Sequence, residues 1–287
     1  MKEQTYILKN TESFEPRHIF ECGQCFRWNK ENDDSYTGIF GRNVLNVKKE
    51  ENNIIFTGIS NESLEKVCKE YFDLYTNYSN IKKKLASIDE HVANSIKYGE
   101  GIRILNQDLW ETIISFIISA NNNIPRIKGI IERISQKYGD EIEWQNKKYY
   151  TFPSIEQLSI ATVEDLRTLG LGFRDKRIYE TTKMFLNKEI TLEELKNEEN
   201  TEKLREKLLT LQGVGPKVAD CIMLFSLKRY EVFPIDVWVR RVMNDLYIHN
   251  DNEEKVSKKE LQKLAKEKYS DLAGLAQQYL FYWKREA

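Results

Sequence analysis

The stretch LLTLQGVGPKVADCIMLFSL, residues 208–227, decides the fold of this chain. It reads as the end of one helix, a tight turn and a second helix. Gly213 and Gly215 flank Val214, so the turn can adopt backbone angles that other residues resist. Pro216 suits the first position of the second helix, because an N–H group there would lack a partner anyway. The stretch therefore predicts two helices joined by a glycine turn.

This turn has two interpretations. A glycine turn that opens a helix leaves backbone N–H groups free, and such groups bind an anion such as a DNA phosphate. The simpler interpretation is a plain connector between helices, which we would favour for an isolated turn. Lys217 and Cys221 lie four residues apart, so they share one face of the second helix. Taken alone, they could be a phosphate-binding lysine and a small buried thiol.

A second informative stretch, EVFPIDVWVRRVMNDLY, covers residues 231–247. Asp236 precedes its helical pattern, and aspartate at a helix N-cap is among the commonest uses of this residue. Together with Lys217, however, Asp236 would form an acid–amine pair. Such a pair suits attack at a sugar carbon that becomes cationic in the transition state.

The rest of the chain predicts an α+β fold, with a small antiparallel sheet followed by a large helical body. Short runs rich in aromatic and β-branched residues indicate strands, and turns are expected at GRN and ENN. The strand runs are YILKN (6–10), QCFRWNK (24–30), SYTGIFG (35–41), VLNVKKE (44–50) and NIIFTGI (53–59). After about residue 61 the periodicity is helical. The expected helices are 61–74, 79–87, 89–98, 108–120, 124–138, 162–169, 173–187, 201–210, 216–228, 236–247, 257–269 and 272–284.

Composition limits the possible functions. The chain has 287 residues, with 44 Lys and Arg against 45 Asp and Glu, so no large positive field surrounds it. Residues 201–287, which contain the glycine turn, hold sixteen basic and thirteen acidic side chains, which leaves a local positive surplus.

Four cysteines do not make a disulfide scaffold in a chain of this length. There is no apolar signal segment and no membrane-length apolar run. We expect a cytoplasmic monomer.

Two patterns together are specific enough to indicate a family. L-x-G-V-G-x-K-V-A-D-C, followed by P-x-D-V, resembles the helix–hairpin–helix Gly-Pro-Asp superfamily of DNA glycosylases, and within it the 8-oxoguanine DNA glycosylase/AP lyase branch. The resemblance covers nearly the whole chain. It includes GQCFRW (23–28), GIRILNQD (101–108), SFIISANNNIPRI (115–127), FPS (152–154), LGLGFR (169–174) and AQQYLF (276–281).

The resemblance implies the chemistry of the site. Lys217 matches the catalytic lysine, which attacks C1′ of the damaged nucleotide and forms a Schiff base. Asp236 matches the aspartate that stabilises charge at the sugar. The hairpin that grips a backbone phosphate, often with a monovalent cation, matches Gly213, Val214 and Gly215.

The resemblance also implies how DNA would be read. Asn121 matches the residue that fills the gap left by a flipped base. Arg126 and Arg174 match the arginines that read the opposite cytosine, and arginine suits planar recognition of bases. Phe173 matches the intercalating wedge. Solvated arginines and an aromatic ring packed at a helix start are the simpler alternatives for these residues.

For the base pocket, the resemblance assigns Cys221 and Phe281 to the two faces of the base and Gln277 to its Watson–Crick edge. Gly23 matches the glycine whose carbonyl accepts the N7–H that distinguishes 8-oxoguanine from guanine. Gln277 and Phe281 are four residues apart, so they point the same way from one helix. Core packing is the alternative for this pair.

Three residues depart from the family pattern. Gln212 stands where the hairpin usually has proline, and Phe173 lacks the hydroxyl of the usual tyrosine. Trp238 stands where relatives often have a histidine that contacts phosphate. The cysteines, Cys22, Cys25, Cys68 and Cys221, are too scattered for an iron–sulfur cluster, so we expect no such cofactor and no metal site apart from the possible monovalent cation.

The sequence therefore predicts a bifunctional enzyme that flips 8-oxoguanine out of duplex DNA, excises it and nicks the strand by β-elimination. The expected domains are a β domain at 1–85 and a helical body at 86–287. The body contains the helix–hairpin–helix at 202–228 and the Pro-x-Asp segment at 234–236. The alternatives are a non-catalytic DNA-binding protein, which would not need Lys217 with Asp236, and a glycosylase for another purine lesion.

Overall fold

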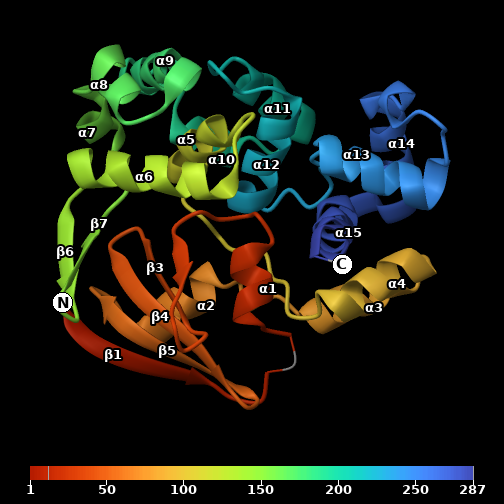
Figure 1. Ribbon diagram of the computed structural model, residues 1–287, viewed down its shortest axis with the longest axis horizontal. Coiled ribbons are helices and arrows are strands. Elements are labelled where there is room, and N and C mark those ends of the chain that lie inside the picture. The colour runs from red at the N-terminus through yellow and green to blue at the C-terminus, as the bar shows by residue number, and fades with distance from the viewer. Residues whose placement is uncertain (12, 287) are drawn as a thin grey trace.

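The computed structural model of the chain describes residues 1–11 and 13–286. Its N-terminal part is a five-stranded antiparallel sheet in the order β1-β5-β4-β3-β2, below the helical body in Figure 1. The strands are β1 (Lys2–Leu8), β2 (Trp28–Lys30), β3 (Tyr36–Phe40), β4 (Asn43–Glu50) and β5 (Asn53–Ser60). Turns join β3 to β4 and β4 to β5 where the sequence predicts them, at 41–42 and 51–52.

The sheet has its own apolar core. Alternate residues of β4 and β5 face inward, and Val47 lies opposite Phe56 in the register, with both fully buried. The helices α1 (Pro16–Glu21) and α2 (Leu64–Tyr71) supply further residues to this core. The sequence did not indicate α1, and the strand expected at 24–30 is limited to Trp28–Lys30.

The helical body contains the expected helices in the expected order, together with two short helices, at 155–159 and 192–197, that the sequence did not indicate. Its helices are α3 (Tyr78–Ala86), α4 (Glu90–Tyr98), α5 (Leu109–Ser119), α6 (Ile124–Tyr138), α7 (Ile155–Ser159), α8 (Val163–Thr168), α9 (Asp175–Leu186), α10 (Leu192–Asn197), α11 (Thr201–Leu209), α12 (Pro216–Leu227), α13 (Val237–Met243), α14 (Lys258–Tyr269) and α15 (Ala273–Glu286). Short 3-10 turns lie at Gly172–Arg174, Glu253–Lys255 and Ser270–Leu272, and a π turn lies at Asn244–Ile248.

Helix starts agree with the cap residues in the sequence. The side chain of Asp108 accepts a hydrogen bond from the N–H of Glu111 at the start of α5. Thr162 and Asp165 form a reciprocal capping box at α8, and Ser257 caps α14. These side chains satisfy N–H groups that the first helical turn leaves free.

One element interrupts the helical body. The strands β6 (Glu141–Trp144) and β7 (Lys147–Tyr150) form a hairpin, whereas the sequence predicts only helices after residue 61. The hairpin extends toward β1 in Figure 1, and the indole Nε1 of Trp144 donates to Glu3 of β1 at 2.7 Å. This hairpin therefore joins the helical body to the sheet.

The main core lies among the helices of the body. Ile113 and Ile117 of α5 and Met223 of α12 have no exposed surface. Tyr78 and Leu85 of α3 pack into this main core and not into the core of the sheet. The boundary predicted at residue 85 stays a prediction.

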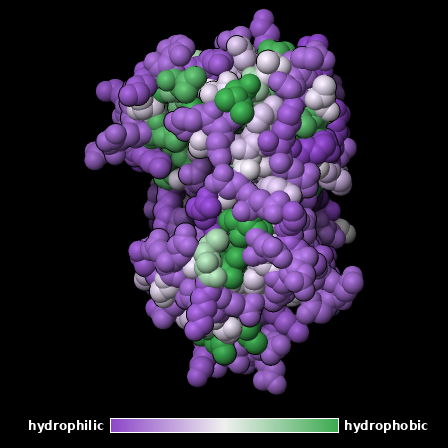
Figure 2. Space-filling view, turned by 90° about the vertical axis from the view of Figure 1, so that its left-hand side faces the viewer, coloured by the Kyte–Doolittle hydropathy of each residue, from purple (hydrophilic) through white to green (hydrophobic). Residues whose placement is uncertain are grey.

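The outer surface is mainly polar. Figure 2 shows one face on which hydrophilic residues predominate and the hydrophobic groups are small and separate. No helix within the described residues is long and apolar enough to cross a membrane.

Candidate active site at the glycine hairpin

A cavity of about 620 Å³ opens where the sheet domain meets the helical body. The residues around it come from the loop after α1, from α5 and α6, and from the starts of α12 and α13 and the end of α15. Those that matter for the chemistry are Gly23, Phe26, Phe116, Asn121, Lys217, Asp236, Trp238, Phe281 and Arg285. Segments more than 250 residues apart in the sequence therefore form one site.

Lys217 reaches this cavity from the first turn of α12. Its Nζ lies 5.4 Å from the centroid of the Phe116 ring, which places the amine against an aromatic wall. Gly215 is the N-cap of α12 and Pro216 its first residue, as the sequence predicts. Gly213 has φ +89°, a backbone conformation that favours glycine. The tight turn thus directs the lysine into the cavity.

Asp236 lines the same cavity from the start of α13. Its Oδ1 accepts a hydrogen bond from the N–H of Val239 at 2.8 Å, so the carboxylate is a helix N-cap. Both interpretations of Asp236 are therefore compatible with its position, because an N-cap side chain is also held in a fixed orientation. The structure brings the carboxylate and the amine of Lys217 to one cavity.

Two of the residues assigned to the base pocket lie side by side in the lining of this cavity. Gly23 has φ +84°, and a Cβ atom built on it would lie 3.6 Å from the Phe281 ring. Gln277 lies one turn before Phe281 and is buried, and its Oε1 accepts from the amide of Gln278 at 2.7 Å. Gln277 does not line the cavity, so its role as a base reader stays a prediction.

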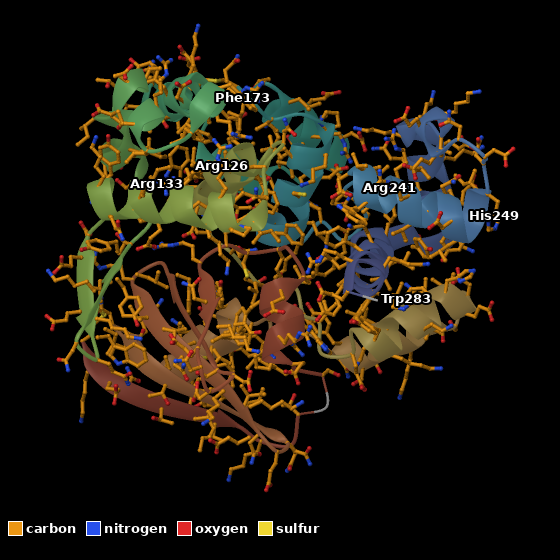
Figure 3. The ribbon with its side chains drawn as sticks, viewed as in Figure 1. Arg126, Arg133, Phe173, Arg241, His249 and Trp283 are labelled. Atoms are coloured by element: carbon orange, nitrogen blue, oxygen red, sulfur yellow. The ribbon has the colours of Figure 1, made fainter. Side chains whose placement is uncertain are left out.

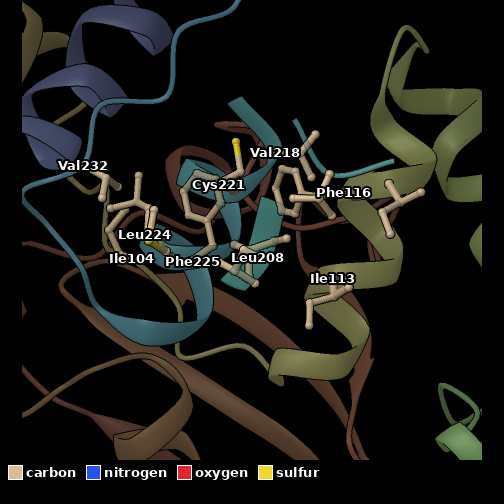
Figure 4. Packing of buried hydrophobic residues seen from close by; sticks show 14 of the residues in the cluster. Ile104, Ile113, Phe116, Leu208, Val218, Cys221, Leu224, Phe225 and Val232 are labelled. Atoms are coloured by element: carbon tan, nitrogen blue, oxygen red, sulfur yellow. The ribbon is translucent and has the colours of Figure 1, made fainter. Parts of the chain in front are cut away.

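Cys221 lies deeper in α12. Figure 4 shows it in the packed region that also contains Val218 and Phe116. Burial raises the pKa of the Cys221 thiol, and the nearby Lys217 opposes this shift. The thiol is therefore held in its neutral form. Cys221 does not line the cavity either, and its contact with a base stays a prediction.

The residues assigned to strand separation form a second group beside the cavity. Phe173 is 55% exposed at the 3-10 turn before α9, and Nη2 of Arg126 on α6 would lie 3.8 Å from a Cβ atom built on the neighbouring Gly172; Figure 3 labels Phe173 and Arg126. The guanidinium of Arg126 is exposed and donates to the Gly170 carbonyl at 3.3 Å. Asn121 has φ +52°, is exposed and lines the cavity. The structure therefore brings the wedge, the gap-filling residue and one arginine together.

Arg174 differs from the sequence expectation of an arginine free to read a base. Its side chain is buried, and its Nε and Nη2 donate to the Ala120 carbonyl at 2.9 and 2.6 Å. Nη2 also donates to the Asn121 carbonyl at 2.7 Å. The guanidinium thus holds the loop that carries Asn121. A role in base reading would require breaking these bonds, and it stays a prediction.

The hairpin gives a stability prediction. Gly213→Ala is expected to destabilise the protein by about 2 kcal/mol, because the new Cβ would lie 2.8 Å from Cδ of Arg177 at a positive φ. Gly215→Ala is the matched control, since no heavy atom lies within 4 Å of its Cβ position and its φ is −98°. We expect the control to cost less than about 1 kcal/mol. Urea unfolding measures both, and equal losses would contradict the prediction.

The remaining cysteines are buried free thiols. Burial raises the pKa of Cys22 to about 11, and it raises the pKa values of Cys25 and Cys68 further. Such thiols are poor nucleophiles, which disfavours a redox role for the Cys22–Cys25 pair. Among the residues described, no three His, Cys, Asp or Glu side chains are grouped as metal ligands. The absence of an iron–sulfur cluster and the monovalent cation at the hairpin stay predictions.

Sequence reasoning missed several residues that line the cavity, among them Phe26, Phe116 and Arg285. Phe26 and Phe116 lie inside the matched segments GQCFRW and SFIISANNNIPRI, so their place in a motif was the available signal. Arg285 lies four residues after Phe281, and helical spacing alone places these two on one face.

Two family models match the chain in sequence. Residues 6–113 match the N-terminal domain of 8-oxoguanine DNA glycosylase. Residues 114–267 match the model described as HhH-GPD superfamily base excision DNA repair protein. Together they span residues 6–267, from within β1 to within α14, and include the glycine hairpin.

Solved structures and curated relatives agree with these models. The apo 8-oxoguanine glycosylase/lyase of Clostridium acetobutylicum is 44% identical, with a TM-score of 0.92 and 98% of each chain covered. The same enzyme with double-stranded DNA containing cytosine opposite 8-oxoG gives a TM-score of 0.93, with 99% of this chain and 97% of that one covered. The N-glycosylase/DNA lyase of Saccharomyces cerevisiae is 34% identical over 78% of this chain and 66% of its own length. The chain belongs to the 8-oxoguanine DNA glycosylase family of the HhH-GPD superfamily.

Proposed function

We propose that this protein is a bifunctional DNA repair glycosylase that excises 8-oxoguanine from duplex DNA and nicks the strand at the resulting site. The observation that carries the proposal is one cavity lined by Lys217, Asp236, Gly23 and Phe281. A nucleophile, a charge-stabilising carboxylate and two walls for a flipped base meet there. A protein that only binds DNA has no need of this combination.

The reaction begins with the unprotonated amine of Lys217. Its Nζ forms a bond to C1′ of the damaged nucleotide while the N-glycosidic bond breaks; the electron pair of that bond leaves with the base, and the proton that Nζ loses neutralises the departing base. The carboxylate of Asp236 stabilises the positive charge that develops on the sugar. Ring opening then gives a Schiff base, and loss of a proton from C2′ expels the 3′ phosphate by β-elimination.

Base recognition uses the walls of the cavity. The Phe281 ring offers a face on which a flipped base can stack. The carbonyl of Gly23 would accept the N7–H of 8-oxoguanine, a proton that guanine lacks. Cys221 and Gln277 complete this recognition in the proposal, as the opposite face and the reader of the base edge.

DNA is held mainly by local contacts. The net charge is −1, so attraction comes from the hairpin amides at 213–215 and from arginines near the wedge. The proposal also includes a monovalent cation bound at the hairpin and no iron–sulfur cluster. It further includes a monomeric state and a cytoplasmic location.

The proposal is tested by trapping the Schiff base with borohydride. A duplex with 8-oxoguanine opposite cytosine should give a covalent adduct with the wild-type protein, whereas an undamaged duplex should not. Duplexes that carry alkylated purines test the alternative substrate class. Normal duplex binding without an adduct would show a DNA-binding protein without this chemistry.

The opposite base gives a further prediction. The wild type should excise 8-oxoguanine opposite cytosine about tenfold faster than opposite adenine, because an arginine fork matches the acceptors of cytosine. Arg126 is exposed and makes one long hydrogen bond, at 3.3 Å to the Gly170 carbonyl, whereas the buried Arg174 donates to the carbonyls of Ala120, Asn121 and Leu171. Arg126→Ala should remove most of the preference. Arg42→Ala, in the sheet domain, is the control. Equal wild-type rates opposite all four bases would contradict the prediction.

A further inference from the structure

Arg285 lies at the cavity, although its part of the sequence gives no sign of chemistry. It follows Phe281 by one turn of α15, and its guanidinium lies 5.2 Å from the centroid of the Phe281 ring. Its Nη1 would lie 3.6 Å from a Cβ atom built on Gly23. This one side chain thus contacts the aromatic wall and lies beside the glycine wall of the cavity.

Arg285 also anchors the loop that carries Gly23. Its Nη2 donates to the carbonyl of Glu21, the last residue of α1. A carbonyl at a helix end has no partner within the helix, and a cation there also interacts favourably with the helix dipole. The loop with Gly23 begins directly after this capped carbonyl, so Arg285 holds the loop at its start.

Neighbouring charges fix the guanidinium in place. Glu286 accepts from Nε of Arg285 at 3.0 Å, and its other oxygen lies 3.5 Å from Nη2 of Arg17 on α1. Arg17 in turn pairs with Glu21 at 3.3 Å. The ends of α1 and α15 are therefore joined by a network whose members restrict one another.

We propose that Arg285 is a positioning residue that holds Gly23 beside the Phe281 ring, in the arrangement that receives 8-oxoguanine. This inference rests on the proposed function. Because the walls are already ordered, the loop with Gly23 loses no further conformational entropy when the base enters. Arg285 should therefore matter for removal of the base and not for chemistry at a sugar that has already lost its base.

The experiment compares two reactions of Arg285→Met, which keeps the aliphatic stem and removes the guanidinium. Excision of 8-oxoguanine in single turnover should fall by about tenfold to a hundredfold, because a charge-assisted hydrogen bond is lost. Nicking and borohydride trapping on a duplex with a preformed abasic site should stay within about twofold of wild type. Arg285→Lys should recover part of the excision rate, since an ammonium can still cap the Glu21 carbonyl.

Lys284→Met is the matched control, because Lys284 is the adjacent cation of α15 and does not line the cavity. It should leave both reactions unchanged. If Arg285→Met excised 8-oxoguanine at the wild-type rate, the positioning role would be overturned. The same would follow if excision and abasic-site trapping fell by equal factors. Neither outcome would affect the proposed function. A wild-type protein that excises no 8-oxoguanine would instead overturn the proposed function and, with it, this inference.

Discussion

Replacement of Lys217 by glutamine is expected to slow release of 8-oxoguanine by more than about a thousandfold and to abolish the borohydride adduct. Among the described residues that line the cavity, Lys217 is the only one with a primary amine. A glutamine has similar length and polarity, so it keeps the packing against Phe116 but cannot form a Schiff base. Single-turnover excision measures the loss of rate, and gel shift measures binding.

Binding of the damaged duplex should persist in Lys217→Gln, because the hairpin amides and the wedge residues are unchanged. Lys203→Gln is the control, since Lys203 is an exposed lysine on α11 of the same hairpin unit. Full trapping by Lys217→Gln would show that another amine is the nucleophile. Loss of binding together with excision would show that Lys217 acts mainly as a phosphate ligand.

The second large effect is expected for Asp236→Asn, which should lower excision by about a hundredfold with little change in stability. Asparagine caps a helix about as well as aspartate does, so the bond to the N–H of Val239 survives. Only the negative charge is lost, and with it the stabilisation of a cationic sugar. Single-turnover rates and urea unfolding measure the two effects separately.

A matched variant separates charge from capping. Asp108 caps α5 in the same way and lies outside the cavity, so Asp108→Asn should change neither excision nor stability appreciably. Asp236→Ala should lose the cap as well, at about 1 kcal/mol. An Asp236→Asn protein with the wild-type rate would show that Asp236 is only a cap.

Local signals predicted the larger elements. Capping residues such as Asp108 and Thr162 mark helix starts, and the glycine turn at 213–215 marks the hairpin. The missed helices α1, α7 and α10 have only five or six residues each, and α1 and the β6–β7 hairpin also lack such signals. No side chain caps α1, which has six residues, and the turn of the β6–β7 hairpin has Gln145 and Asn146 at positive φ, without the usual glycine.

The motifs predicted which segments meet at the candidate site, but not which of their side chains line the cavity, because Cys221 and Gln277 do not line it. Lys217, Asp236, Asn121, Gly23 and Phe281 all line the cavity. Arg174 is buried against Ala120, which lies 54 residues earlier in the chain, and Arg285 caps α1 at Glu21, which lies 264 residues earlier. The periodicity of the sequence does not encode contacts between residues so far apart. Tertiary packing decides what such arginines do.

The position of α15 has a consequence for synthesis of the protein. The hairpin and Lys217 leave the ribosome before residues 273–286, yet Phe281 and Arg285 come from this last helix. Leu275 and Tyr279 of α15 also fill the main core. A nascent chain that already contains the DNA-binding hairpin and Lys217 therefore still lacks one wall of the base pocket. The pocket that distinguishes damaged from intact bases can therefore form only after α15 has been synthesised and has packed against the main core.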